Sequence, residues 1–196
     1  MLSDTLGKSV QLYNNALSNN QLSEWKILNS DQFYWSYSKI ISEEDLKDKT
    51  KYNHQFVHTV YKDYAPQSFF FSYCLPLLRI LKVRSLYRIK LNLTLPTEKP
   101  EELGDYHNDL TWNNKIDKDC KVAIYYPFKT NGLLQIKEDD NIIEVENQHN
   151  QLVTFPNTLP HLGISNTDGV NRYALNIVYF WKENKWQDIA ISYNMK

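Results

Sequence analysis

The sequence is poor in cysteine and has no long apolar run. Its 196 residues include two cysteines, Cys74 and Cys120, which are too few for a disulfide framework and lack a metal-ligand spacing. The most hydrophobic stretch, residues 69–81, is shorter than the roughly 20 apolar residues that cross a bilayer. The N-terminus is polar and lacks the apolar core of a signal peptide. We therefore expect a cytoplasmic protein without a membrane partner.

An excess of charge of either sign is also missing. The chain has 22 Lys and Arg against 23 Asp and Glu, and its formal net charge is -1. Without a global positive field or a basic segment interleaved with aromatic residues, nucleic acid is not an expected partner. The 42% hydrophobic content is that of an ordinary globular protein, and the length suits a single domain.

The first part of the chain, residues 1–84, predicts a helical region. Residues 9–19 and 42–61 mix apolar and polar positions as surface helices do, and Ser42 precedes acidic residues as an N-cap would. Residues 65–83 carry an apolar stripe at helical spacing. Pro76 should either kink this helix or divide it in two.

At Tyr87 the hydrophobic period changes to two. Apolar residues alternate with Arg88, Lys90, Asn92 and Thr94, which indicates a strand with one apolar and one polar face. Short strands separated by turns follow at 122–126, 133–136, 142–145, 152–155, 159–165 and 172–181. This spacing is typical of a sandwich or barrel. We expect a mainly β fold in one domain, residues 1–196, with a helical support at 1–84 and a β core at 85–182.

The polar face of the first core strand has two possible environments. If the N-terminal helices cover the apolar face, then Arg88 and Asn92 point into the barrel. The alternative is an edge strand whose polar face is wet.

His107 and Asp109 form a candidate metal-binding pair. Residues two apart on an extended segment point to the same side, so both side chains can bind one ion. The pair alone is weak evidence, and Asp105 on the other side of His107 is a rival carboxylate. His161 follows 52 residues after Asp109, far enough for several short strands. Two histidines and one carboxylate are the facial triad that non-haem iron(II) oxygenases use.

Arg172 adds a second kind of site. It stands 11 residues after His161 and shares a strand face with Ala174 and Asn176. A buried guanidinium is costly unless it is paired, and a bidentate ligand carboxylate would pair it. An internal salt bridge to an acidic residue is the alternative.

These motifs together resemble the 2-oxoglutarate- and iron(II)-dependent oxygenase superfamily, and especially the small prolyl-4-hydroxylase-like proteins of marine bacteria and phages. The resemblance covers about half of the chain. The matching residues are 88–93, 106–109, 122–126, 131–132, 153–156, 161–163, 168 and 172–176.

The resemblance implies a double-stranded β-helix, that is, a cupin-like jelly roll, and a dioxygenase that hydroxylates a peptide, a protein side chain or a small metabolite. Iron(II), 2-oxoglutarate and O2 would be required, and ascorbate is a candidate accessory reductant. His107, Asp109 and His161 would hold the metal, while Arg172 would bind the far carboxylate of 2-oxoglutarate.

Further contacts are implied around this centre. Tyr125 or Tyr126 would donate a hydrogen bond to the co-substrate, and strand parity favours Tyr125. Asn92 and Asn176 would also meet the co-substrate, and Arg88 and Trp112 are candidates for the substrate.

One departure and two alternatives remain. Where the superfamily often has glycine or an aromatic residue followed by threonine, this chain has Leu133 and Leu134, which puts a small polar contact in doubt. A demethylase of alkylated nucleic acid would share the metal set, and a cupin-like binding protein would share the barrel without turnover. Arg172 argues against the second alternative, because metal binding alone needs no inward arginine.

Overall fold

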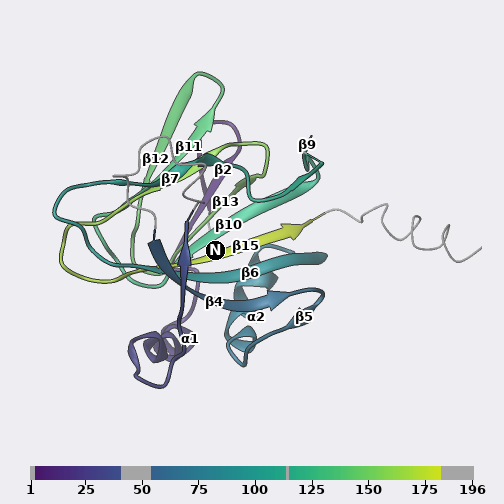
Figure 1. Ribbon diagram of the computed structural model, residues 1–196. Coiled ribbons are helices and arrows are strands. Elements are labelled where there is room, and N and C mark those ends of the chain that lie inside the picture. Colours follow the sequence, from purple (N-terminus) through teal and green to yellow (C-terminus); the bar gives the residue numbers. More distant parts are fainter. Residues whose placement is uncertain (1–2, 41–53, 114, 182–196) are drawn as a thin grey trace, which may run out of the picture.

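The computed structural model describes residues 3–40, 54–113 and 115–181 (Figure 1). Its elements are β1 (Ser3–Leu6), β2 (Val10–Asn14), α1 (Asn19–Glu24), the 3-10 helix η1 (Trp25–Asn29), β3 (Ser36–Lys39), β4 (His54–Lys62), β5 (Ala65–Pro66), α2 (Phe71–Ile80), β6 (Ser85–Thr94), β7 (Glu102–His107), β8 (Thr111–Trp112), β9 (Lys115–Ile116), β10 (Cys120–Tyr126), β11 (Leu133–Glu138), β12 (Asn141–Glu146), β13 (Gln151–Pro156), β14 (His161–Ile164) and β15 (Arg172–Phe180). No helix in these ranges is long and apolar enough to span a bilayer.

Two antiparallel sheets form the body of the protein. The larger has the strand order β1-β2-β13-β10-β15-β6-β4-β3, with β5 paired to β4, and the smaller has the order β12-β11-β14-β7. A separate hairpin pairs β8 with β9. Along the chain, β7 of the smaller sheet comes between β6 and β10 of the larger one, and β14 comes between β13 and β15, so the connections cross between the sheets. The predicted jelly-roll fold is confirmed.

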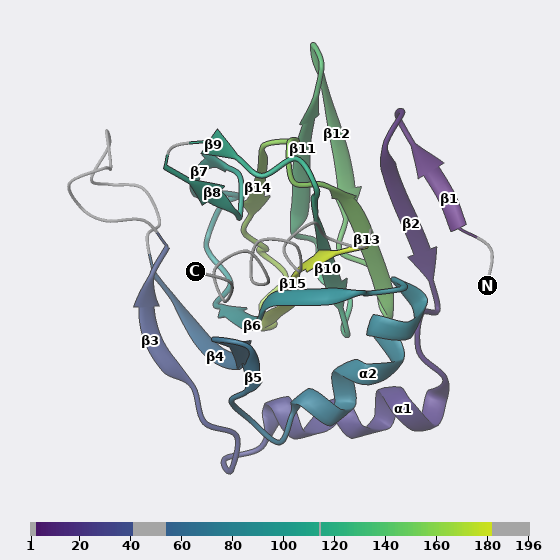
Figure 2. The same cartoon turned by 90° about the vertical axis from the view of Figure 1, so that its right-hand side faces the viewer.

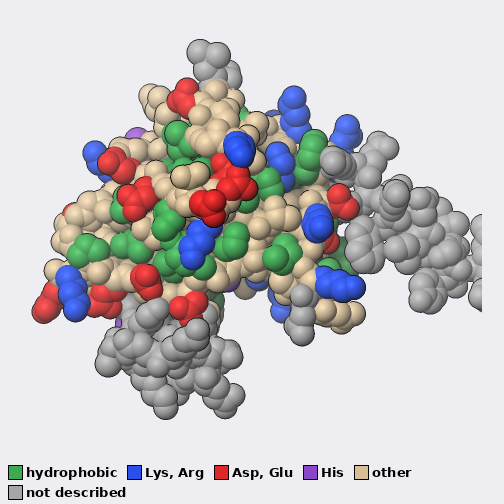
Figure 3. All heavy atoms as spheres, turned by 90° about the horizontal axis from the view of Figure 1, so that it is seen from above, with side chains coloured by type: hydrophobic (Ala, Val, Ile, Leu, Met, Phe, Trp, Pro, Cys, Tyr) green, Lys and Arg blue, Asp and Glu red, His purple; other side chains and the backbone are tan. Residues whose placement is uncertain are grey.

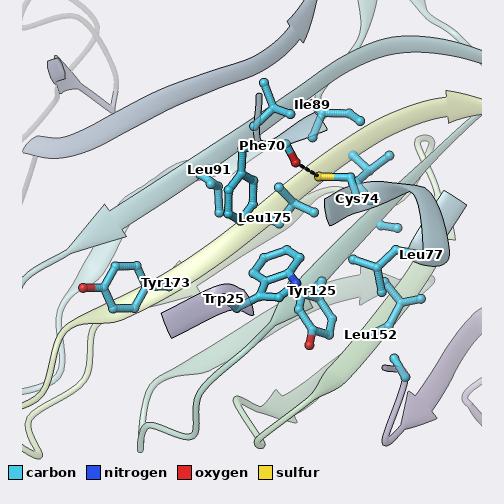
Figure 4. Packing of buried hydrophobic residues seen from close by; sticks show 14 of the residues in the cluster. Trp25, Phe70, Cys74, Leu77, Ile89, Leu91, Tyr125, Leu152, Tyr173 and Leu175 are labelled. Atoms are coloured by element: carbon cyan, nitrogen blue, oxygen red, sulfur yellow. Dashed lines mark hydrogen bonds between the residues drawn. The ribbon is translucent and has the colours of Figure 1, made fainter. Parts of the chain in front are cut away.

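Hydrophobic residues fill two layers on opposite faces of the large sheet. Between the sheets lies a cluster that includes Ile124, Leu134 and Phe155. On the outer face, α1, η1 and α2 cover the sheet, as Figure 2 shows. There Trp25 packs edge-on against Phe70 at 4.9 Å and Tyr125 at 4.8 Å between ring centroids (Figure 4). The helices therefore shield the apolar side and leave the inner face free to carry polar groups.

Strand β6 follows the predicted alternation. Ile89 and Leu91 are fully buried in the outer cluster, while Lys90, Asn92 and Thr94 line a cavity on the inner side. The strand pairs with β15 on one side and β4 on the other, so it is not an edge strand. Its polar face thus points into the barrel.

The predicted helices of the N-terminal region are wrong in two places. The helix predicted at 9–19 is strand β2 followed by a turn, and the second half of the helix predicted at 42–61 is strand β4. Residues 42–53, including the Ser42 cap, lie outside the described residues. Strand β4 is rich in β-branched and aromatic residues such as Val57, Thr59 and Tyr61, which favour strands when a sheet edge is available to pair with.

The third predicted helix is present but shorter. Helix α2 covers Phe71–Ile80 and keeps Pro76 inside a single helix, with Cys74 and Leu77 on its buried side. The N-terminal region therefore combines helices with strands of the large sheet. Whether it serves mainly as support for the core stays a prediction.

Truncating the aromatic side chain that joins η1 to the sheet should strongly destabilise the protein. Trp25 is fully buried, so Trp25→Ala should lower the free energy of unfolding by about 3–5 kcal/mol. Tyr64, which is 89% exposed, is the control, and Tyr64→Ala should change it by less than about 0.5 kcal/mol. Urea unfolding measures both. A Trp25→Ala loss no larger than that of the control would show that the helical layer does not stabilise the sheet.

Candidate metal and co-substrate site

Three predicted ligands converge at one end of the barrel. His107 and His161 are direct partners in the β7–β14 pair, with ring centroids 4.5 Å apart. Asp109 lies two residues beyond the end of β7, and its Oδ2 is 3.4 Å from Nε2 of His161. One ligand atom from each residue lies within 4.8 Å of the other two. The strand register therefore assembles a two-nitrogen, one-oxygen donor set.

Polar contacts hold the Asp109 carboxylate in place. Arg88 donates to Oδ1 at 2.7 Å, and Asn176 donates through Nδ2 to Oδ2 at 2.8 Å. The segment that follows Asp109 is fixed by Asn157, which is fully buried and exchanges hydrogen bonds with the backbone of Leu110. Because Oδ1 of Asp109 accepts the hydrogen bond from Arg88, Oδ2 is the oxygen directed at the histidines.

The electrostatics of Asp109 and His107 suit a cation. Burial would raise the pKa of the Asp109 carboxyl, but the hydrogen bond and charge of His161 and the charge of Arg88 hold it well below its usual range. Desolvation, followed by the charge of His161, lowers the pKa of His107. Nδ1 of His107 lies 2.9 Å from the backbone carbonyl oxygen of Asp105, which leaves Nε2 for a metal. An ionised carboxylate and neutral imidazoles are the forms that bind divalent metals.

The triad opens into a cavity of about 330 Å³ between the two sheets. This volume suits a small co-substrate together with part of a substrate. The lining residues are Ile40, Gln55, Lys90, Asn92, Thr94, Leu103, His107, Asp109, Ile124, Leu134, His161, Gly163, Arg172, Ala174 and Asn176. Leu134, where a small polar contact was in doubt, contributes to an apolar wall.

Arg172 lies on the cavity wall and is 6% exposed. One Nη donates to the hydroxyl of Tyr126 at 3.3 Å, while its Nε is buried without a partner. No acidic residue in the described ranges pairs with it, so the internal salt bridge considered above is not found there. Gly132 and Gly163 border the side chain, where an added Cβ would lie 3.2 Å from Cδ and 3.5 Å from Nη2 of Arg172. The guanidinium thus fits beside two glycines, and its Nε–H donates to no described residue.

Three of the residues predicted to make contacts do not line the cavity. Tyr125 lies on the outer face of β10 and donates to Asn150, because parity turns Tyr126 rather than Tyr125 towards Arg172. Trp112 is 54% exposed on the β8–β9 hairpin and does not line the cavity. Arg88 is paired with Asp109 and is likewise absent from the lining. Asn92 and Asn176 do line the cavity.

Sequence reasoning did not assign a role to two lining residues of β6. Thr94 is the strand partner of Arg172, and its hydroxyl is buried without a hydrogen bond. Lys90 is the strand partner of Asn176 and lies near the triad. The alternation of β6 already put both on the polar face, which was the signal that could have identified them.

Comparisons with solved structures support the fold. No protein-family model and no curated protein matches the chain. Among solved structures, an oxidoreductase of the 2OG-Fe(II) oxygenase family from Burkholderia pseudomallei aligns with a TM-score of 0.64 at 10% identity, covering 90% of this chain and 87% of the other. The chain has the fold of the 2-oxoglutarate- and iron(II)-dependent oxygenases.

Two further oxygenase structures extend the likeness. A prolyl hydroxylase from Trichoplax adhaerens, in complex with a peptide fragment, aligns with a TM-score of 0.60 at 14% identity, covering 94% and 87% of the two chains. HygX from Streptomyces hygroscopicus, with nickel and 2-oxoglutarate bound, aligns with a TM-score of 0.58 at 8% identity, covering 88% and 82%. Since identity is this low, the site residues of this chain must support the chemistry by themselves.

Proposed function

We propose that this protein is a non-haem iron(II)- and 2-oxoglutarate-dependent dioxygenase that hydroxylates a peptide, a protein side chain or a small metabolite. The proposal rests on one observation: a candidate metal site and a candidate carboxylate site lie in the same cavity. The His107, Asp109 and His161 donor set needs a cation, and the buried guanidinium of Arg172 needs an anion. A chelating keto acid with a second carboxylate supplies both needs at once.

The donor set fits iron(II). Two imidazole nitrogens and one carboxylate oxygen on one side of an ion leave positions open for a chelate and for dioxygen. Bound iron would couple the decarboxylation of 2-oxoglutarate to succinate and CO2 with the oxidation of a substrate C–H bond. Arg88 and Asn176, which both contact Asp109, orient the carboxylate in the way that outer partners of metal sites do.

The far end of the cavity fits a carboxylate. Arg172 offers an unpartnered Nε–H, and the Thr94 hydroxyl on the neighbouring strand is also without a partner. Charge-assisted hydrogen bonds from these groups would hold the remote carboxylate of 2-oxoglutarate and fix its orientation. Asn92, opposite Ala174 between the two ends, would contact the middle of the co-substrate. Ile124 and Leu134 would exclude water from this part of the cavity.

The same features separate this proposal from its alternatives. A protein that only binds a metal does not need a buried arginine without an acidic partner in the described ranges at the far end of the same cavity. A nucleic-acid demethylase would need a cationic surface for the phosphate backbone. On the face that Figure 3 shows, acidic and basic side chains are interspersed, which offers no continuous basic track there.

Spectroscopy of the anaerobic protein tests the proposal directly. Addition of iron(II) and 2-oxoglutarate together should produce the weak visible charge-transfer absorption of a keto acid chelated to iron(II), because the triad leaves room for bidentate binding. Iron(II) alone, or iron(II) with succinate, should give no such band. If the folded protein gives no band with both components, the proposed function is wrong.

A further inference from the structure

The cavity holds a second cationic side chain besides Arg172. Lys90 lines it from strand β6, where it pairs in register with Asn176 of β15 and Thr59 of β4. Asn176 in turn donates to Asp109, so Lys90 lies at the metal end. Arg172 pairs with Thr94, four residues further along β6, which corresponds to about 13 Å of strand. The two cations therefore occupy opposite ends of the cavity.

Lys90 is not neutralised by a close partner. In the described part of the chain, no hydrogen bond or ion pair of its ammonium is found, although the Asp109 carboxylate is near enough to interact. That carboxylate is already bonded to Arg88 and Asn176. Burial, followed by repulsion from Arg88, lowers the pKa of Lys90 to about 8, while Asp109 opposes the shift. Lys90 is partly buried, and a partly buried cation without a close anion is less favourable than a paired one, so a ligand anion would stabilise it.

The charges of iron and co-substrate do not supply that anion. Arg88 and Asp109 balance each other, and the two charges of iron(II) balance the two carboxylates of 2-oxoglutarate. The positive charges of Lys90 and Arg172 then remain in the cavity. In the proposed function, Arg172 would hold the remote carboxylate of the co-substrate and the metal would hold the other carboxylate, which would leave Lys90 for a different molecule.

We propose that Lys90 binds a carboxylate group of the substrate, so that the enzyme oxidises a molecule with a free carboxylate close to the reacting carbon. This inference rests on the proposed function. A single ammonium suits a carboxylate better than a phosphate dianion, which proteins usually hold with several cations or a helix N-terminus. Substrates of this class include free amino acids, other small carboxylic acids and side chains of Asp or Glu in a peptide.

A small carboxylate probe tests the assignment without knowledge of the substrate. The protein is loaded anaerobically with iron(II) and saturating 2-oxoglutarate, and the charge-transfer band is followed while acetate or acetamide is added. Acetate at millimolar concentrations should perturb the band, and acetamide, which has the same shape but no charge, should not. Lys90→Met should need at least about tenfold more acetate, since it loses one charge-assisted hydrogen bond. Lys90→Arg should retain the response.

The matched control is Lys137→Met, because Lys137 stacks its ammonium over the Tyr106 ring 3.6 Å away and does not line the cavity. It should behave like the wild type. The assignment is overturned if the wild type does not respond to acetate, if acetamide is equally effective, or if Lys90→Met responds as the wild type does. A parallel weakening of 2-oxoglutarate binding in Lys90→Met would assign Lys90 to the co-substrate instead. Absence of the band in the wild type would reject the proposed function itself.

Discussion

Replacing Arg172 with methionine should raise the dissociation constant of 2-oxoglutarate about a hundred- to a thousandfold, while the affinity for iron(II) changes by less than about threefold. The guanidinium is buried and, among the residues that the structure describes, is bonded only to Tyr126, so its remaining donors are available to a ligand carboxylate. His107 and His161 lie on other strands and Asp109 lies just after β7, so we expect the metal donors to keep their positions. Titration of the anaerobic charge-transfer band with each component separates the two affinities.

The stability of the ligand-free variant provides the control for this result. A guanidinium that held an internal salt bridge would cost about 3–5 kcal/mol when one partner is removed. With no acidic partner in the described ranges, Arg172→Met should leave the free energy of unfolding unchanged or raise it. Arg172→Lys should bind 2-oxoglutarate with intermediate affinity, because it keeps the charge but loses the planar fork. Equal losses of iron and co-substrate affinity would mean that Arg172 is only structural.

Replacing Asp109 with alanine should abolish metal binding. The residue supplies the single carboxylate of the donor set, so the affinity for iron(II), or for nickel(II) as a redox-stable probe, should fall by more than about a hundredfold. Arg88→Met, which removes only an outer partner of that carboxylate, should cost about ten- to a hundredfold. Calorimetric titration of the ligand-free proteins with nickel(II) measures the series.

The neighbouring acidic residue gives a stringent comparison. Asp105 precedes His107 by two residues just as Asp109 follows it, but its side chain is exposed and outside the ligand cluster. Asp105→Ala should therefore keep the nickel(II) affinity within about twofold. If Asp105→Ala and Asp109→Ala lose affinity equally, the carboxylate ligand has been assigned incorrectly.

The core strands were predictable because their hydrophobic period is local. Alternation from Tyr87 onward located β6, a separate run located β15, and the parity of each predicted which side chains share a face. The same parity on β15 placed Arg172 and Asn176 in one cavity. The hydrogen bond between Tyr126 and Arg172 was missed. Tyr125 and Tyr126 are adjacent on β10 and point to opposite faces of the sheet, and which of the two faces the cavity depends on how β10 pairs with distant strands.

The N-terminal strands and the support of the triad were not predictable for a different reason. Strand β4 forms because β6 offers it a partner, which a local pattern does not reveal. Asn157 holds the loop of Asp109 from 48 positions away, through its backbone contacts with Leu110 and its neighbours. Such contacts are a property of the folded chain, and the residue type alone does not signal them.

The position of β15 also bears on how the protein acquires its structure. This strand bridges β10 and β6 in the middle of the large sheet, yet it follows every other described strand in the chain. During synthesis the two halves of that sheet keep unpaired edges and an incomplete apolar layer until β15 emerges. Pairing over such long sequence separations is slow and exposes the chain to aggregation. We expect the cavity to form late, in the same step that inserts Arg172.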